Sequence, residues 1–311
     1  MGGNAIWKYR AREALRGHWL TALLIALVVN LPSLLVQAVA VATGNDLGLR
    51  MNELLSSSVN AAGTAVDAQR LVKGMRELTQ STGIWVMQGL NVAAWLLTPC
   101  LVLGMTAWLL GRLRKQEDPG MTAVFSRMRL FFPGIGLRLY VAWRIFVFML
   151  PGVALSVLAF LPLWLSDGSS RISVLSAVNT VAGLQYAAMA VMLVLGVMAA
   201  MKYALADTVL ADGRMEGPVR AAKESKRLTQ GKKGQLFALY LSFLFWVILE
   251  NLAVGFCESA FGPVPGLMVQ MLASLAISVY LSASVCAFYL DCVGEPIPER
   301  TEDNNDTDWV A

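Results

Sequence analysis

Apolar residues in this chain gather in long runs that are bounded by charged residues, glycine or proline. Six such runs occur, at about residues 18–43, 84–111, 135–165, 173–206, 235–256 and 266–290. Each run reaches the roughly 20 residues that an α-helix needs to cross the ~30 Å hydrocarbon core of a bilayer. The pattern therefore predicts an all-α membrane protein with six transmembrane helices.

Composition supports this class and excludes others. The chain is 57% hydrophobic and only 15% charged, whereas soluble domains are roughly 45–50% apolar and about 25% charged. Its net charge of +4 is small, so we expect no nucleic-acid partner. The single histidine and the absence of a C-x-x-C pair argue against a zinc, haem or iron–sulfur site. We therefore expect no metal site and no cofactor.

Lysine and arginine are divided unequally between the two sides that these six helices would define. Sixteen lie before the first helix or in the second and fourth loops, and five lie in the first and third loops. Since loops rich in lysine and arginine stay in the cytoplasm, both termini should be cytoplasmic. The acidic tail, 293–311, lacks apolar periodicity and should be disordered.

A short basic amphipathic segment precedes the first, third and fifth membrane helices. The segments are residues 1–17, about 119–132 and about 218–231. Basic amphipathic helices bind at the bilayer interface, with the apolar face toward lipid and the basic face toward anionic headgroups. We therefore expect three units within the bundle of residues 18–292, each an interfacial helix followed by a membrane hairpin. The basic residues expected at the lipid surface include Arg12, Arg16, Arg127, Arg129, Lys226 and Arg227.

The first outer loop, residues 45–83, is too long to be a plain connection. Its apolar residues fall at helical spacing on either side of Gly63. The spacing predicts two short helices on the outer surface. A lid over a substrate path is the alternative, because long loops are sometimes functional.

Polar residues inside the fifth helix need a physical reason, because a charge at the bilayer centre costs at least about 2.5–3.5 kcal/mol. Glu250 lies deep in this helix, next to Asn251. Either a protonated carboxyl bonds another helix, or the pair lies on an ion or proton path. Serines at four-residue spacing in the sixth helix could permit close helix packing or line a hydrated path.

Four further charges are expected at the cytoplasmic ends of the helices. They are Arg144, Lys202 beside Tyr203, Asp207 and Asp291. If the three units surround a common axis, these charges would converge as an ionic cluster in which each offsets the desolvation of the others. We expect the cluster to hold the bundle together; binding of a lipid headgroup phosphate is the second interpretation.

Several short motifs resemble those of a known family. They are Arg12 to Gly17 (REALRG), Lys202 to Asp207 (KYALAD), Leu210-Ala211-Asp212, the helix with Ser225, Leu228 and Gly231, and Phe288-Tyr289-Leu290-Asp291. In these motifs the chain resembles the bacterial integral-membrane family called domain of unknown function 975. That family is more distantly similar to the six-helix membrane domain of some glycerophosphodiester phosphodiesterases. The resemblance implies a six-helix bacterial membrane protein and no known reaction.

The sequence carries none of the common catalytic signatures, such as G-x-S-x-G, H-E-x-x-H or a P-loop. We therefore expect that the protein is not an enzyme. The favoured hypothesis is a non-catalytic bundle that lies in the lipid bilayer and binds anionic lipid headgroups or another membrane protein. The alternative is a small transporter or channel with a polar path near Glu250.

Overall fold

The computed structural model describes residues 3–44, 47–58, 68–116, 120–125, 127–158, 171–215 and 217–295. All regular secondary structure in these ranges is helical, as the apolar runs predict. The α-helices are α1 (Gly3–Leu15), α2 (Trp19–Ala42), α3 (Leu47–Ser58), α4 (Ala68–Gln80), α5 (Thr82–Leu113), α6 (Phe131–Leu158), α8 (Arg171–Tyr203), α9 (Ala206–Asp212), α10 (Pro218–Leu228), α11 (Lys233–Phe261) and α12 (Pro263–Val293). Two 3-10 segments, η1 (Gly120–Phe125) and η2 (Met128–Leu130), precede α6.

Six of these segments are long and apolar enough to cross a membrane. They are Trp19–Ala40, Thr82–Leu113, Met128–Leu158, Gly183–Asp212, Lys233–Phe261 and Met268–Val293. The prediction of an all-α chain with six spans is confirmed. The chain is therefore a multi-pass membrane protein in contact with the lipid bilayer.

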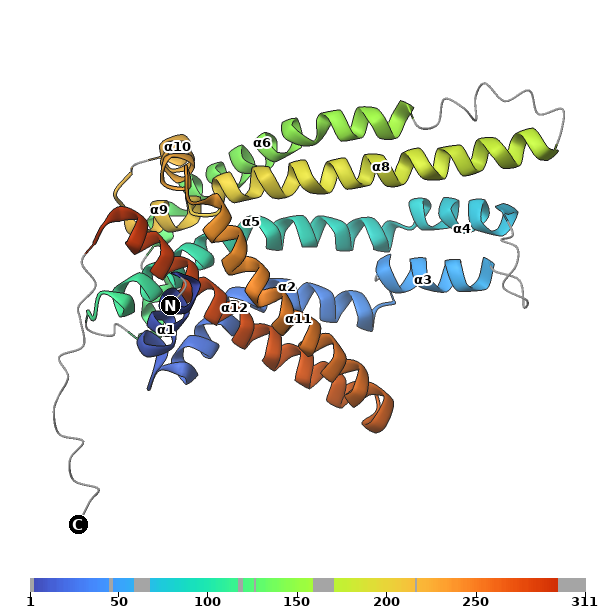
Figure 1. The fold of residues 1–311 in the computed structure, drawn as a ribbon. Coiled ribbons are helices and arrows are strands. Elements are labelled where there is room, and N and C mark those ends of the chain that lie inside the picture. Colours follow the sequence, from blue (N-terminus) through green and yellow to red (C-terminus); the bar gives the residue numbers. More distant parts are fainter. Residues whose placement is uncertain are drawn as a thin grey trace, which may run out of the picture.

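The spans form three hairpins, α2 with α5, α6 with α8, and α11 with α12, and the two helices of each hairpin pack together. Figure 1 shows α1, α9, α10 and the carboxyl ends of α5 and α12 gathered at one end of the molecule. We call this the basic end. At the opposite end the α11–α12 hairpin diverges from the α6–α8 hairpin. The hairpins are therefore held together mainly at the basic end.

Helix α1 packs on the bundle through its apolar stripe. Trp7, Ala11 and Leu15 are buried, and the rings of Trp7 and of Phe288 on α12 form a T-shaped pair with a centroid distance of 4.8 Å. The ammonium of Lys8 lies 4.6 Å from the centre of the Phe243 ring, and burial lowers the pKa of Lys8. The apolar face of α1 thus contacts protein, where the sequence predicted contact with lipid.

Helix α10 is seated in the same way. Pro218 occupies its first turn, where the missing backbone N–H costs nothing. Ala221, Ala222 and Ser225 are buried against the bundle, and α10 contacts α6, α9 and α8. The first and third predicted basic segments are therefore helical, but protein covers their apolar faces, while Arg12, Arg16 and Lys226 are exposed.

The segment between α5 and α6 differs from the predicted second basic helix. The 3-10 segments η1 and η2 occupy it, and α6 begins at Phe131, ahead of Pro133. Pro133, just after the predicted segment, lies in the first turn of α6, where a proline breaks no backbone hydrogen bond. Val124 of η1 is buried against α5.

Two short helices occupy the loop of residues 45–83, as predicted. Helices α3 and α4 pack against each other and extend beyond α2 and α5 at the end opposite to α1 (Figure 1). The contact is close, since a Cβ on Gly74 would lie 2.1 Å from a methyl of Leu54. Gly63, at the predicted turn, lies outside the described residues, and so does the tail from 296 onward.

Gly104 of α5 sets the fit of η1 and yields the first prediction. A Cβ at this position would lie 1.9 Å from the carbonyl oxygen of Val124, so Gly104→Ala requires η1 to move. We expect a loss of about 1–3 kcal/mol of stability and a lower midpoint of thermal unfolding in detergent. Gly89 of the same helix has no atom within 4 Å of such a Cβ, so Gly89→Ala should leave the midpoint unchanged or raise it slightly. Equal midpoints for the two variants would contradict this packing.

Candidate functional site

A break between α8 and α9 orients the polar groups of the basic end. Helix α8 ends at Tyr203 and α9 begins at Ala206, and such a break leaves backbone groups without helical partners. The buried hydroxyl of Ser225 on α10 accepts a hydrogen bond from the Leu205 N–H (3.2 Å) and donates one to the Lys202 carbonyl (3.1 Å). Ser225 therefore stabilises the break and ties α10 to it.

Helix α9 carries Asp212 into the middle of the basic end. Thr208, Val209, Leu210 and Ala211 are all buried. The helix ends at Gly213, whose φ of +75° is the left-handed conformation that glycine adopts without strain. The side chain of Asp212, just before it, is only 4% exposed.

Two arginines and a tyrosine surround this carboxylate. Oδ1 accepts from Nη1 of Arg114 at 2.6 Å, and Oδ2 pairs with Nε of Arg214 at 2.6 Å. The Tyr289 hydroxyl of α12 donates to Oδ2 at 2.9 Å. Glu295, after α12, accepts from Arg114 at 2.9 and 3.0 Å and also pairs with Arg214. We call these five residues the Asp212 network.

The network joins segments that are far apart in the sequence. Arg114 follows α5, Asp212 is the last residue of α9, Arg214 follows α9, Tyr289 lies on α12 and Glu295 follows α12. Two guanidinium groups face two carboxylates, so each buried charge has the partner that burial requires. Within the described residues no group of three histidine, cysteine or acidic side chains could hold a metal ion. The network therefore acts as a clamp, by which we mean that it holds the ends of α5, α9 and α12 together.

The residues of the predicted ionic cluster have other partners in the structure. Arg144 is exposed and donates to the Tyr140 hydroxyl at 3.1 Å, and the Lys202 ammonium lies 3.9 Å from the centre of the Phe148 ring. Asp291 is 3.9 Å from Lys232. Among the described residues, no ion pair within 4 Å joins Arg144, Lys202, Asp207 and Asp291 to one another.

The positions of the helix ends explain why Asp212, and not Asp207, meets the arginines. Asp207 is half-buried in the first turn of α9, and Tyr203, the last residue of α8, is half-buried against the core. Asp212 comes a turn later, where arginines from two loops reach it. The missed signal was Leu210-Ala211-Asp212 together with Tyr289, both noted only as family-like motifs.

Glu250 and Asn251 lie in the part of α11 that is least covered by protein. Glu250 is half-buried, and its neighbours Leu249 and Leu252 are exposed. The Asn251 amide donates to the Val247 carbonyl of its own helix at 2.7 Å. Within the described residues no hydrogen bond joins Glu250 to another helix. The serines of α12 behave alike, since Ser274 and Ser278 donate to carbonyls of α12 itself.

The basic residues predicted at the lipid surface have different surroundings. Arg12, Arg16, Arg129 and Lys226 are exposed, whereas Arg127 is half-buried. Arg227 is exposed but donates to Glu224 at 2.9 and 2.6 Å, which raises the pKa of Arg227 and offsets its charge.

A separate group of like charges lies at the end of α8. Lys202 is within electrostatic range of Lys226 and Lys233. We call these three residues the lysine patch.

Comparison with known proteins identifies the family of this chain. The chain matches the model of the family described as "Protein of unknown function (DUF975)" over residues 4–294. The chain belongs to this family. No curated protein and no solved structure matches it. The resemblance to the membrane domain of glycerophosphodiester phosphodiesterases stays a prediction.

The motifs that suggested the DUF975 family now have physical roles in this member of it. Asp212 and Tyr289 come from two motifs and bond each other in the Asp212 network. Ser225 stabilises the α8–α9 break, and Gly231 has a φ of +83° after α10. These motifs therefore build the basic end.

The Asp212 network yields the second prediction. Asp212→Asn removes the charge between two arginines, which should cost about 2–3 kcal/mol. This is less than for a fully buried pair, because solvent screens Arg214 in part. Asp291→Asn is the matched control, since its pair with Lys232 is long and exposed and should contribute about 0.5 kcal/mol or less. Thermal unfolding in detergent measures both variants, and an Asp212→Asn midpoint equal to that of the control would refute the clamp.

Proposed function

We propose that this protein is a non-catalytic bundle of the bacterial inner membrane, with both termini in the cytoplasm, that binds anionic lipid headgroups at its basic end. The unequal distribution of lysine and arginine supports the orientation, because the basic end carries most of these residues. Belonging to a family of unknown function supplies no activity, so the proposal rests on the basic end itself.

The lysine patch is the observation that carries the proposal. Lys202 lies on the last turn of α8, and its ammonium lies 3.9 Å from the centre of the Phe148 ring. A lysine near the end of a membrane helix can extend its stem along apolar surface and turn its ammonium toward headgroups. Lys226 and Lys233 are both exposed, and their charges act on Lys202. Three like charges repel one another, and the phosphate of an anionic lipid would relieve this repulsion.

The buried apolar faces of α1 and α10 also support binding of headgroups at the basic end. Because protein already covers these faces, neither helix needs to insert into the bilayer to bury them. The exposed residues Arg12, Arg16 and Lys226 on these helices can then meet headgroups. The interfacial helices thus act as rigid carriers of positive charge, fixed to the bundle by Trp7 and Ser225.

The non-catalytic part of the proposal rests on the Asp212 network. Every carboxylate oxygen of Asp212 and Glu295 is already bonded to an arginine or a tyrosine. A general base needs a free oxygen within reach of a substrate proton. These carboxylates therefore have no free oxygen for a substrate proton, and their role is to hold helix ends together.

The transport hypothesis finds less support. Glu250 lies on a helix whose neighbouring residues are exposed toward lipid. Nothing in the surroundings of Glu250 favours a polar path over a lipid-facing carboxyl.

The third prediction tests the lysine patch. The triple variant Lys202→Gln, Lys226→Gln, Lys233→Gln should retain phosphatidylglycerol about tenfold to hundredfold less well, since each lysine near an anionic surface contributes about 1 kcal/mol. Native mass spectrometry of protein released from nanodiscs of phosphatidylglycerol and phosphatidylcholine measures the enrichment. The control is Lys73→Gln with Arg76→Gln, two exposed charges on α4 at the opposite end.

Equal enrichment for the triple variant and the control would sink the lipid proposal. If the triple variant keeps its lipid but loses a co-purifying membrane protein, the basic end binds a protein partner and the lipid assignment is wrong.

A further inference from the structure

The end of the chain carries a concentration of negative charge for which the proposed function gives no role. Residues 296–311, which we call the distal tail, lie outside the described residues. Their charged residues are five carboxylates and one arginine, namely Glu299, Arg300, Glu302, Asp303, Asp306 and Asp308. The whole chain nevertheless has a net charge of +4, so the residues before the tail are more basic than this total indicates.

The structure fixes the point at which the distal tail begins. Helix α12 ends in a Schellman cap, in which the Gly294 N–H bonds the Asp291 carbonyl at 3.3 Å and the Glu295 N–H bonds the Leu290 carbonyl at 3.2 Å. Pro296 follows at once and cannot continue the helix. The Glu295 side chain is held by the two arginines of the Asp212 network. The distal tail therefore starts from an anchored residue of the basic end.

The lysine patch lies close to this starting point. The Lys232 ammonium is 3.9 Å from a carboxylate oxygen of Asp291, which is about one helical turn before Glu295. Lys233 follows Lys232 directly, and its charge acts on Lys202. The sixteen residues of the distal tail could span about 55 Å if fully extended. The patch is therefore within reach of the tail's carboxylates.

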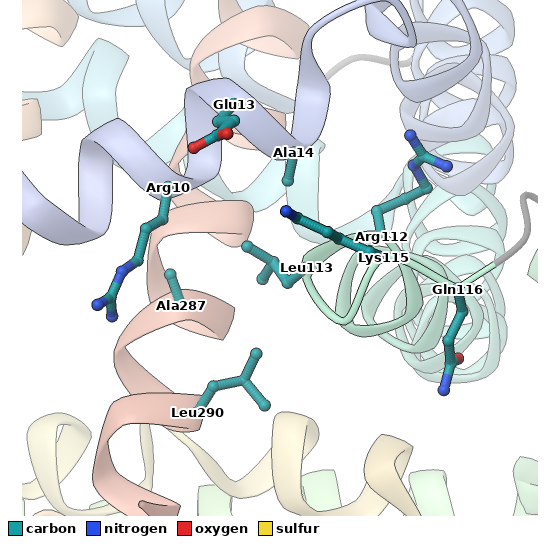
Figure 2. Close-up of a pocket in the computed structure, with 9 residues that line it drawn as sticks. All are labelled: Arg10, Glu13, Ala14, Arg112, Leu113, Lys115, Gln116, Ala287 and Leu290. Carbon is teal, nitrogen blue, oxygen red and sulfur yellow. The ribbon is translucent and has the colours of Figure 1, made fainter. Parts of the chain in front are cut away.

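The lysine patch also has charges that the chain itself leaves unpaired. Within the described residues, no ion pair within 4 Å joins Lys202, Lys226 or Lys233 to a carboxylate. Cations also border a cavity of about 270 Å³ between α1, the end of α5 and α12. There, however, Figure 2 shows the guanidinium groups of Arg10 and Arg112 pointing apart. The lysine patch, in contrast, brings three like charges within electrostatic range of one another.

We propose that the distal tail binds the lysine patch of its own chain through its carboxylates. Each contact between an exposed lysine and a carboxylate is weak and is screened by salt. Attachment at Glu295 compensates, because a short tether gives the tail a millimolar effective concentration at the patch. Several carboxylates can then relieve the repulsion among the three lysines without any one fixed geometry.

The consequence of this contact rests on the proposed function. If the lysine patch binds anionic headgroups, the distal tail competes with them for the same three cations. Lipid would displace the tail only where anionic headgroups are abundant, because the tail is always present at the patch. The tail thus acts as an autoinhibitory segment that sets how much anionic lipid is required.

Cross-linking tests the contact without any anionic lipid. A carbodiimide joins a carboxylate and an amine that touch, with loss of water, and leaves no spacer. In the full chain in neutral detergent at about 0.01 M salt, tail carboxylates should link to the lysine patch at least about tenfold more often than to Lys73 of α4. At about 1 M salt these links should largely disappear, since the screening length falls to about 3 Å. Peptide mass spectrometry locates and counts them.

A mixture of isotope-labelled and unlabelled chains distinguishes links within one chain from links between two. Links within one chain support the proposal. It is overturned if the lysine patch is linked no more often than Lys73, or if its links join different chains.

A lipid measurement tests the competition. In the tail variant all five carboxylates become amides, by the changes Glu299→Gln, Glu302→Gln, Asp303→Asn, Asp306→Asn and Asp308→Asn. In nanodiscs of phosphatidylglycerol and phosphatidylcholine, this variant should retain about three- to tenfold more phosphatidylglycerol than the wild type. Glu77→Gln, which removes an exposed carboxylate of α4 at the opposite end, should leave retention unchanged.

Combining the tail variant with the lysine-patch triple variant separates the two proposals. Without the lysines the five tail changes should have no effect on lipid retention; an equal gain in both backgrounds would show that the tail acts through overall charge and would overturn the contact. If no chain enriches phosphatidylglycerol, the proposed function fails. The cross-links, which need no anionic lipid, still decide in that case whether the tail binds the patch.

Discussion

The buried carboxylate of Asp212 and the two arginines that face it hold the helix ends of the basic end together. A charge that is almost fully removed from water persists only where opposite charges and hydrogen bonds replace the water. Arg114, Arg214 and Tyr289 do so here, and Glu295 satisfies the arginines in turn. Because these residues come from different helices, the requirement to neutralise one carboxylate fixes where α5, α9 and α12 end relative to one another.

Fewer contacts hold the three hairpins together at the end opposite to the basic end. Away from the basic end the α11–α12 hairpin diverges, and large apolar residues along α8 and α11 are exposed (Figure 1). In a bilayer such residues meet lipid tails, so their exposure carries no penalty, and apolar burial cannot draw the helices together. Polar contacts must supply the specificity. The Asp212 network and the Ser225 bridge are such contacts, and both lie at the same end.

The surface of that end follows from the same packing. Since the bundle covers the apolar stripes of α1 and α10, Arg12, Arg16 and Lys226 are left exposed. The lysine patch contains the last lysine of α8 and exposed lysines of α10 and α11. The Asp212 network uses none of these cations, so they remain available to an anionic partner.

The sequence by itself determined the class and the spans. Twenty or so consecutive apolar residues can only be helical in lipid, where each backbone group must find its partner within the segment; the two short helices on either side of Gly63 follow from spacing alone. Only the tertiary structure decided which charges meet. Asp207 and Asp212 lie close together in the sequence, yet only Asp212 lies where Arg114 and Arg214 converge. Such a meeting depends on how helix ends from different hairpins are placed in space, and neither periodicity nor composition carries that information.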